Sequence, residues 1–83
     1  MDKILVVIYV PLLEKKYDVF IPINKKVGSI KKVIISTINE IENNAITNVE
    51  SLKLYNKEDC RVYNNNIYVK SSGMVNGTNL MLI

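Results

Sequence analysis

The sequence predicts a small α+β domain in which a mixed β-sheet of four to five strands is covered on one face by one helix. Three observations predict this class. A continuous, β-branched apolar run stands near the N-terminus, one amphipathic helical pattern occupies residues 30–41, and short strand-like segments separated by turn residues fill the rest. The 83 residues provide room for one core, so we expect a single domain over residues 1–83.

The first two expected strands form an antiparallel hairpin. Lys3–Val10 is a continuous apolar run, as expected of a central strand, and Pro11 ends it because proline has no N–H to donate to a ladder. In Tyr17–Ile23 the aromatic and aliphatic residues at alternate positions share one face. Pro22 within this run is typical of an edge strand, so we expect one central and one edge strand.

A helix is expected after the loop Asn24–Gly28. Ser29 is the expected N-cap, because its hydroxyl can accept a hydrogen bond from an unpaired backbone N–H. Residues 43–44, both asparagine, are expected to end the helix because asparagine tolerates the left-handed conformation. Ile35 falls outside the apolar stripe and is expected to be exposed. The stripe itself recurs at helical spacing and consists of Ile30, Val33, Ile34, Thr37, Ile38 and Ile41.

Three more strands are expected after the helix. Gly73 and the Asn76-Gly77 pair mark backbone reversals that need positive φ, and Ile67–Ser72 reads as a short 3₁₀ segment or irregular crossover. The expected strands are Ser51–Tyr55, Cys60–Tyr63 and Thr78–Ile83. This order of two strands, a helix and three strands is that of the β-grasp, or ubiquitin-like, fold, in which the first and last strands lie parallel at the sheet centre.

The composition argues against an enzyme. The chain has no histidine, which excludes Ser-His and Cys-His catalysis. It has one cysteine, which excludes an internal disulfide framework and, without histidine, the ordinary zinc ligand sets. No glycine-rich phosphate cradle or paired-carboxylate site is evident. We therefore expect no catalytic residue, no metal and no cofactor.

The net charge of +3 is unevenly distributed, since residues 1–32 carry +4 and residues 33–83 carry −1. A basic nucleic-acid-binding module is one alternative, but arginine, which reads base edges, occurs once. The lysines could instead form a basic rim for an acidic partner or an anionic lipid, or simply keep loops and an edge strand soluble. The lysines concerned are Lys15, Lys16, Lys25, Lys26, Lys31 and Lys32.

Both faces of the two central strands carry apolar side chains, although one helix can cover only one face. The uncovered set predicts a protein-binding surface, unless a loop such as Ile67–Met74 folds over it. We expect Leu80 and Leu82 to point inward and the set with Tyr9, whose hydroxyl can stay in water, to point outward. A one-residue shift in register would exchange the sets. The expected protein-binding residues are Leu5, Val7, Tyr9, Lys53, Tyr55, Met81 and Ile83.

Two segments resemble a known family. Tyr17–Ile34 (YDVFIPINKKVGSIKKVI) and Leu54–Ile83 are similar to the opening and closing segments of the YukD/EsaB ubiquitin-like proteins, small accessory proteins of bacterial type VII secretion systems. The amino-terminal domain of the EccD membrane component of those systems is related to them. The resemblance covers nearly the whole chain, and the proline of Phe20-Ile21-Pro22 is its most selective element.

The resemblance implies a non-enzymatic cytosolic adaptor or regulator of type VII secretion that acts through protein–protein contacts. We expect its partner to be a membrane or ATPase component of the machinery. The uncovered apolar sheet face adds a weak homodimer as a further expectation, and the single arginine argues against nucleic acid. Ile4–Leu13 is too short for a membrane span, which needs ~20 residues. A ubiquitin-like modifier or sulfur carrier is the alternative, but residues 80–83 read Leu-Met-Leu-Ile where that chemistry needs Gly-Gly.

Overall fold

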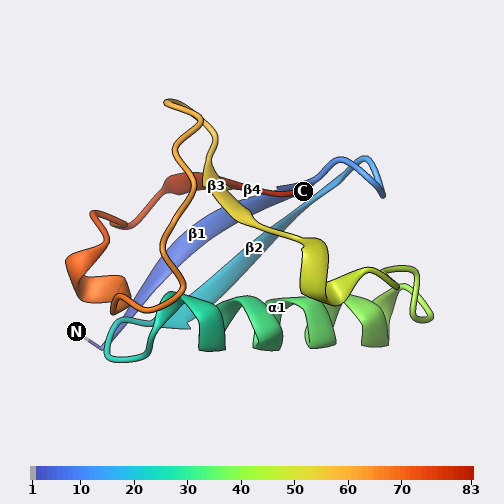
Figure 1. The fold of residues 1–83 in the computed structure, drawn as a ribbon, viewed down its shortest axis with the longest axis horizontal. Helices are drawn as coiled ribbons and strands as arrows, with labels where there is room; N and C mark the ends of the chain where they lie inside the picture. The colour runs from blue at the N-terminus through green and yellow to red at the C-terminus, as the bar shows by residue number, and fades with distance from the viewer. Residues whose placement is uncertain (1) are drawn as a thin grey trace.

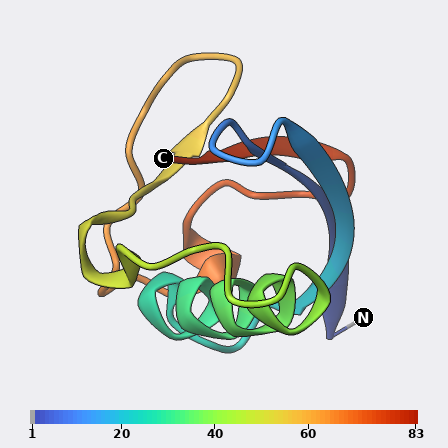
Figure 2. The same cartoon turned by 90° about the vertical axis from the view of Figure 1, so that its right-hand side faces the viewer.

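A curved sheet wraps one side of the α-helix (Figures 1 and 2). The computed structural model describes residues 2–83. Its elements are β1 (Lys3–Val10), β2 (Lys15–Pro22), α1 (Val27–Ile41), the 3₁₀ helix η1 (Val49–Ser51), β3 (Leu54–Asn56), the 3₁₀ helix η2 (Val69–Ser71) and β4 (Thr78–Leu82). The strand order is β2-β1-β4-β3, with β1 and β4 parallel at the centre and both edge strands antiparallel to their neighbours. The predicted ubiquitin-like β-grasp fold is confirmed.

Alternate residues of the two central strands point into the core beneath the sheet. Val6, Ile8 and Val10 of β1 are at most 1% exposed. Leu80 and Leu82 of β4 are equally buried, which confirms the direction predicted for them. Because successive side chains of a strand point to opposite faces, the residues between these lie on the side of the sheet away from α1.

Strand β2 is the free edge that its proline predicts. It begins at Lys15, two residues earlier than expected, because a tight turn after β1 already reverses the chain. In that turn the Leu13 N–H donates to the Val10 carbonyl at 3.0 Å, and Glu14 adopts φ +53°. Pro22 ends the strand at the sheet edge, where the missing N–H costs no ladder bond.

The helix begins at Val27, so the prediction of Ser29 as its N-cap is wrong. The Val27 N–H donates to the Ile67 carbonyl and the Gly28 N–H to the Asn65 carbonyl, both at 2.9 Å. Backbone carbonyls of Asn65 and of Ile67, the first residue of the crossover, therefore satisfy the first helical donors, which otherwise need a side-chain cap. These acceptors lie far along the chain, where a local capping pattern cannot indicate them.

The buried face of α1 is rotated relative to the predicted stripe. Ile35, expected to be exposed, is 2% exposed, whereas Val33 and Ile41 are 62% and 67% exposed. Ile46 and Leu52, from the segment between α1 and β3, join the same core as Ile35. The helix thus packs against this segment as well as against the sheet, which displaces its buried face. That face consists of Val27, Ile30, Lys31, Ile34, Ile35 and Ile38, and Thr37 of the predicted stripe is exposed.

The strand predicted over Cys60–Tyr63 is wrong, because this segment makes only one isolated bridge to β3. The Cys60 N–H donates to the Asn56 carbonyl at 2.9 Å and Cys60 adopts φ +58°, which makes the segment a turn. The third strand, expected over Ser51–Tyr55, starts only at residue 54 because η1 precedes it.

The predicted backbone reversals are confirmed at four positions. Asn43 and Asn44, directly after α1, have φ of +54° and +60°, and Gly73 and Gly77 have φ of +89° and +87°. The crossover over Ile67–Ser72 contains η2, as expected.

The longest helix of residues 2–83 is α1 with 15 residues, and no helix in this range is long and apolar enough to cross a membrane.

Candidate protein-binding surface

The sheet face turned away from α1 brings the predicted binding residues together in rows. The register places Tyr9 of β1 opposite Lys16 of β2 on one side and opposite Met81 of β4 on the other. Tyr55 of β3 lies opposite Met81. Because directly opposed residues of a sheet share a face, these four side chains form one continuous row across all four strands.

The next rows add residues that the sequence analysis did not select. Val7 lies opposite Asp18 of β2 and Asn79 of β4, and Leu5 lies opposite Phe20. Phe20 is 67% exposed, so it enlarges the apolar part of this face. Both β2 residues could have been placed here once the hairpin register was known, since they alternate with the inward side chains of their strand.

The remaining predicted residues lie at the β3 end of this face. Lys53 and Ile83 exchange two backbone hydrogen bonds of 2.7 and 3.0 Å, and both side chains are exposed. Lys57, which was not predicted, places its Nζ 5.0 Å from the centroid of the Tyr9 ring, a cation–π contact. The other predicted residues, Leu5, Val7, Tyr9, Tyr55 and Met81, are half-buried. Their role in protein binding stays a prediction.

The segment that could have covered this face lies on the other side of the sheet. Val69 and Met74 are buried in the same cluster as the inward residues of β1 and β4. Figure 1 shows η2, in orange, beside the start of α1 at the end of the fold where β1 begins. The Val69 N–H donates to the Lys25 carbonyl at 2.9 Å, which fixes the segment beside the start of the helix. The alternative of a covering loop over Ile67–Met74 is therefore wrong.

The six lysines of the predicted basic rim do not form one surface. Lys31 is 9% exposed, and its ammonium donates to the Leu52 carbonyl at 2.9 Å. Lys15 is held by Glu42 at 3.0 Å. The stem of Lys31 thus belongs to the core, which excludes it from any rim. Across residues 2–83, no three His, Cys, Asp or Glu side chains lie together so that they could hold a metal ion.

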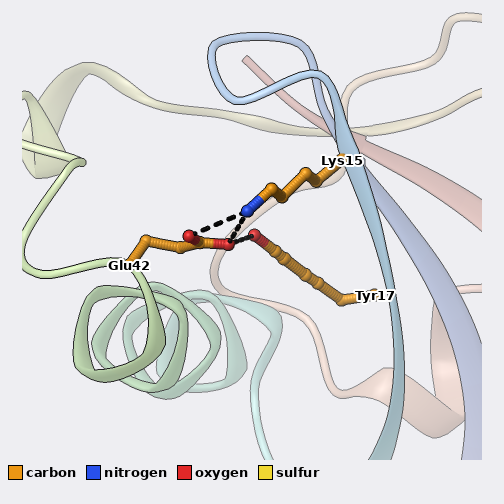
Figure 3. A network of polar contacts seen from close by, with 3 residues as sticks. All are labelled: Lys15, Tyr17 and Glu42. Carbon is orange, nitrogen blue, oxygen red and sulfur yellow. Dashed lines mark hydrogen bonds and ion pairs between the residues drawn. The ribbon is translucent and has the colours of Figure 1, made fainter.

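A polar network ties β2 to the end of α1 (Figure 3). Glu42, immediately after the helix, accepts a hydrogen bond of 2.5 Å from the Tyr17 hydroxyl and two of 3.0 Å from the Lys15 ammonium. Hydrogen bonds from Tyr17 and then Lys15 lower the pKa of Glu42. Burial, together with the neighbouring carboxylate, raises the pKa of Tyr17 to about 12. The ionised form of Glu42 is the form that the fold favours.

The Glu42→Gln variant is expected to lose stability that depends on pH. Because folding lowers the pKa of Glu42 from its ordinary value of 4.5, its stabilising effect is present above that value and is lost as the pH falls through the folded pKa. Urea unfolding of the wild type from about pH 3 to pH 7 should show this fall, and the variant should show a flatter profile. Glu40→Gln, the same exchange on exposed helix surface, serves as control; equal profiles for both variants would contradict the network's role.

Solved ubiquitin-like structures resemble this chain along its whole length. The ubiquitin-like domain of the Mycobacterium tuberculosis type VII secretion system protein EccD1 aligns with a TM-score of 0.71 at 12% identity, covering 100% of this chain and 99% of that one. A chain of the MycP5-free ESX-5 inner membrane complex gives 0.78 at 10% identity, covering 100% of this chain and 21% of that one.

A third likeness is to a chain from a structure on molecular mimicry of SUMO in the promotion of DNA repair. Its TM-score is 0.79 at 13% identity, and the alignment covers 100% of this chain and 92% of that one. No family model and no curated protein matches the sequence. At these identities the likenesses establish the ubiquitin-like fold.

Proposed function

We propose that this chain is a non-enzymatic, cytosolic adaptor of a type VII protein secretion system, which binds a protein component of the machinery through the outer face of its sheet. The observation that carries the proposal is the apolar row on that face. Tyr9, Tyr55 and Met81 lie side by side there, while α1 packs on the opposite face. A face of this composition is typical of a binding surface.

The charges around the row indicate the chemistry of the partner. Lys16 stands at one end of the row, and Lys57 contacts the Tyr9 ring. Lys53 is exposed in the adjacent row, and Asp18 is the acidic residue placed among them by the register. An apolar anchor surrounded by carboxylates would complement this pattern, since the centre of an interface carries the affinity and the charged rim orients the partner.

Two likenesses support a secretion component as that partner. The run Tyr17–Ile34 resembles the YukD/EsaB proteins, and its proline ends the edge strand β2. The whole chain shares its fold with the EccD1 domain. We therefore infer that the partner is a membrane or ATPase component of a type VII system.

Replacing Met81 and Ile83 together by lysine tests the surface. The double variant is expected to keep the wild-type circular dichroism spectrum, because neither side chain points into the core. It should bind the cytosolic region of the membrane component or of the ATPase at least about tenfold more weakly, because two interface contacts are replaced by charges. Isothermal titration calorimetry measures this change.

Val33→Lys with Ile41→Lys is the matched control, since it makes the same exchange at two exposed positions of α1. This variant is expected to bind like the wild type. An unfolded Met81/Ile83 variant would show that these side chains belong to the core, and wild-type affinity in it would exclude the outer face as the binding surface. A wild-type chain that binds neither component would exclude the secretion role.

A further inference from the structure

A groove of about 290 Å³ separates the edge strand β2 from α1. Its walls are mainly apolar, with Val19 and Ile21 on the strand and Val33, Thr37 and Ile41 on the helix. Val33 and Ile41 are more than 60% exposed even though they line this groove. Both residues belong to the helical stripe that the sequence predicts to be buried. The fold therefore leaves exposed apolar side chains on α1 beside the edge strand β2.

Along this groove, one side of the β2 backbone carries N–H and carbonyl groups that make no hydrogen bond to a neighbouring strand of residues 2–83. The Ile23 N–H donates to the Asp2 carbonyl at 2.9 Å, which sets the phase of the ladder between β1 and β2. Because the bonds of an antiparallel ladder alternate, the N–H and carbonyl groups of Lys16, Asp18 and Phe20 point away from β1. Within residues 2–83, no strand pairs with this side of β2. An open edge of this kind is a template for another strand.

The charges of α1 run against its own dipole. Its first turn contains no acidic residue and its last turn no basic one. Lys26 stands at the N-terminal end and Glu40 near the C-terminal end, the reverse of what the helix dipole favours. Glu40 lies seven residues after Val33, two helical turns along the same face, and Lys26 lies the same number of residues before Val33, directly ahead of the first turn. An antiparallel copy of this face, centred on Val33, would place Lys26 opposite Glu40 twice.

We propose that two copies of this chain associate about a twofold axis at this edge, with β2 paired antiparallel to its counterpart and α1 packed antiparallel against the second α1. A strand pair centred on Val19 opposes Asp18 to Phe20 and pairs the outward N–H and carbonyl groups of these two residues in both copies. The helix pair covers the apolar stripe and matches the opposite charges. A second copy is the occupant because strand, stripe and charges are each self-complementary under a twofold axis.

The proposed dimer interface is small, so the dimer is expected to be weak and is tested over a wide range of protein concentrations. Each copy contributes one strand of eight residues and one side of a helix. Such an interface belongs to the class below about 1,200 Å², in which association is weak and reversible. Sedimentation velocity on the intact chain, from about 10 µM to about 1 mM, is expected to show a monomer that becomes a dimer as concentration rises.

Two double variants locate the interface. Val33→Lys with Ile41→Lys is expected to stay monomeric at all these concentrations with an unchanged circular dichroism spectrum. Met81→Lys with Ile83→Lys, on the outer sheet face, is expected to dimerise like the wild type. A monomeric wild type at the highest concentration would overturn the proposal, and so would a dimer that only the Met81/Ile83 variant disrupts. Either result leaves the adaptor proposal to be decided by its own binding experiment.

A charge exchange tests the antiparallel arrangement of the helices. Lys26→Glu and Glu40→Lys are each expected to raise the dimer dissociation constant about tenfold, because each creates two like-charge contacts. An equimolar mixture of the two variants is expected to regain wild-type affinity as a heterodimer, since every contact is again between opposite charges. Failure of the mixture to regain affinity would overturn the antiparallel helix pair.

A disulfide tests the strand pair. Cys60 is exposed and free, so it is first replaced by serine. In that background Val19→Cys is expected to form a covalent dimer under mild oxidation, because residues opposed across an antiparallel pair lie about 4.5–5.5 Å apart between their Cα atoms, within disulfide range. Lys57→Cys, an exposed position away from β2, is the control and should remain largely uncrosslinked. Equal crosslinking of both variants would overturn the β2 pairing.

Discussion

Replacing Ile8 by alanine is expected to lower the free energy of unfolding by about 2–5 kcal/mol. Ile8 is fully buried in β1 and lies between Tyr17 of β2 and Leu80 of β4. The substitution removes apolar contacts and leaves a cavity where two strands and the helix meet. A domain of this size has a total stability near the lower end of about 5–15 kcal/mol, so the variant should keep only a fraction of the wild-type stability.

Urea denaturation followed by circular dichroism measures this loss. Ile8→Val removes one methylene and should cost about 0.5–1.5 kcal/mol, which tests whether the effect scales with the volume removed. Val7→Ala, on the opposite face of the same strand, should cost less than Ile8→Ala because Val7 is only half-buried. Equal costs at positions 7 and 8 would contradict the assignment of the two faces of β1.

The Leu80→Lys variant is expected not to fold at neutral pH. Leu80 is fully buried and lies opposite Ile8 in the parallel pair at the centre of the sheet. A lysine there must bury an unpaired ammonium, at a cost of several kcal/mol that approaches the whole stability of the domain. The near-ultraviolet circular dichroism signal of the tyrosines should therefore be lost.

Met81→Lys is the neighbouring control for this effect. The side chain of Met81 points to the opposite face of β4, where a lysine can reach solvent, so this variant should fold. A folded Leu80→Lys variant, or an unfolded Met81→Lys variant, would show that the faces of β4 are exchanged. The substitutions Leu80→Lys and Met81→Lys lie at adjacent positions and add the same charge, so a difference in folding between the two variants reports which face each side chain occupies.

Local pattern was sufficient to predict the parts of the fold that depend on strand alternation and turn chemistry. The continuous apolar run of β1, the proline of β2 and the positive-φ residues after α1 each led to the observed structure. Alternation in β1 and β4 likewise placed Tyr9 and Met81 on the outer face. These features follow from properties of a few consecutive residues.

The errors in the start and the buried face of α1 arose where a distant segment decides the outcome. The start of α1 depends on carbonyls of residues 65 and 67, and the burial of Ile35 depends on the segment that carries Ile46 and Leu52. The contact of Lys57 with Tyr9 and the place of Phe20 depend on register across strands. Such contacts form only in the assembled fold, so neither capping rules nor a helical wheel could indicate them.

The support of the first turn of α1 by the crossover has a consequence for the order of events in folding. The acceptors for Val27 and Gly28 belong to the second half of the chain, so the hairpin and the helix cannot reach their final form ahead of that half. The same dependence applies to β1, whose parallel partner β4 comes last among the strands. Non-local contacts of this kind slow the search for the native state. A nascent chain that has released only its first half therefore holds a helix without its anchoring acceptors and a sheet without its central pair.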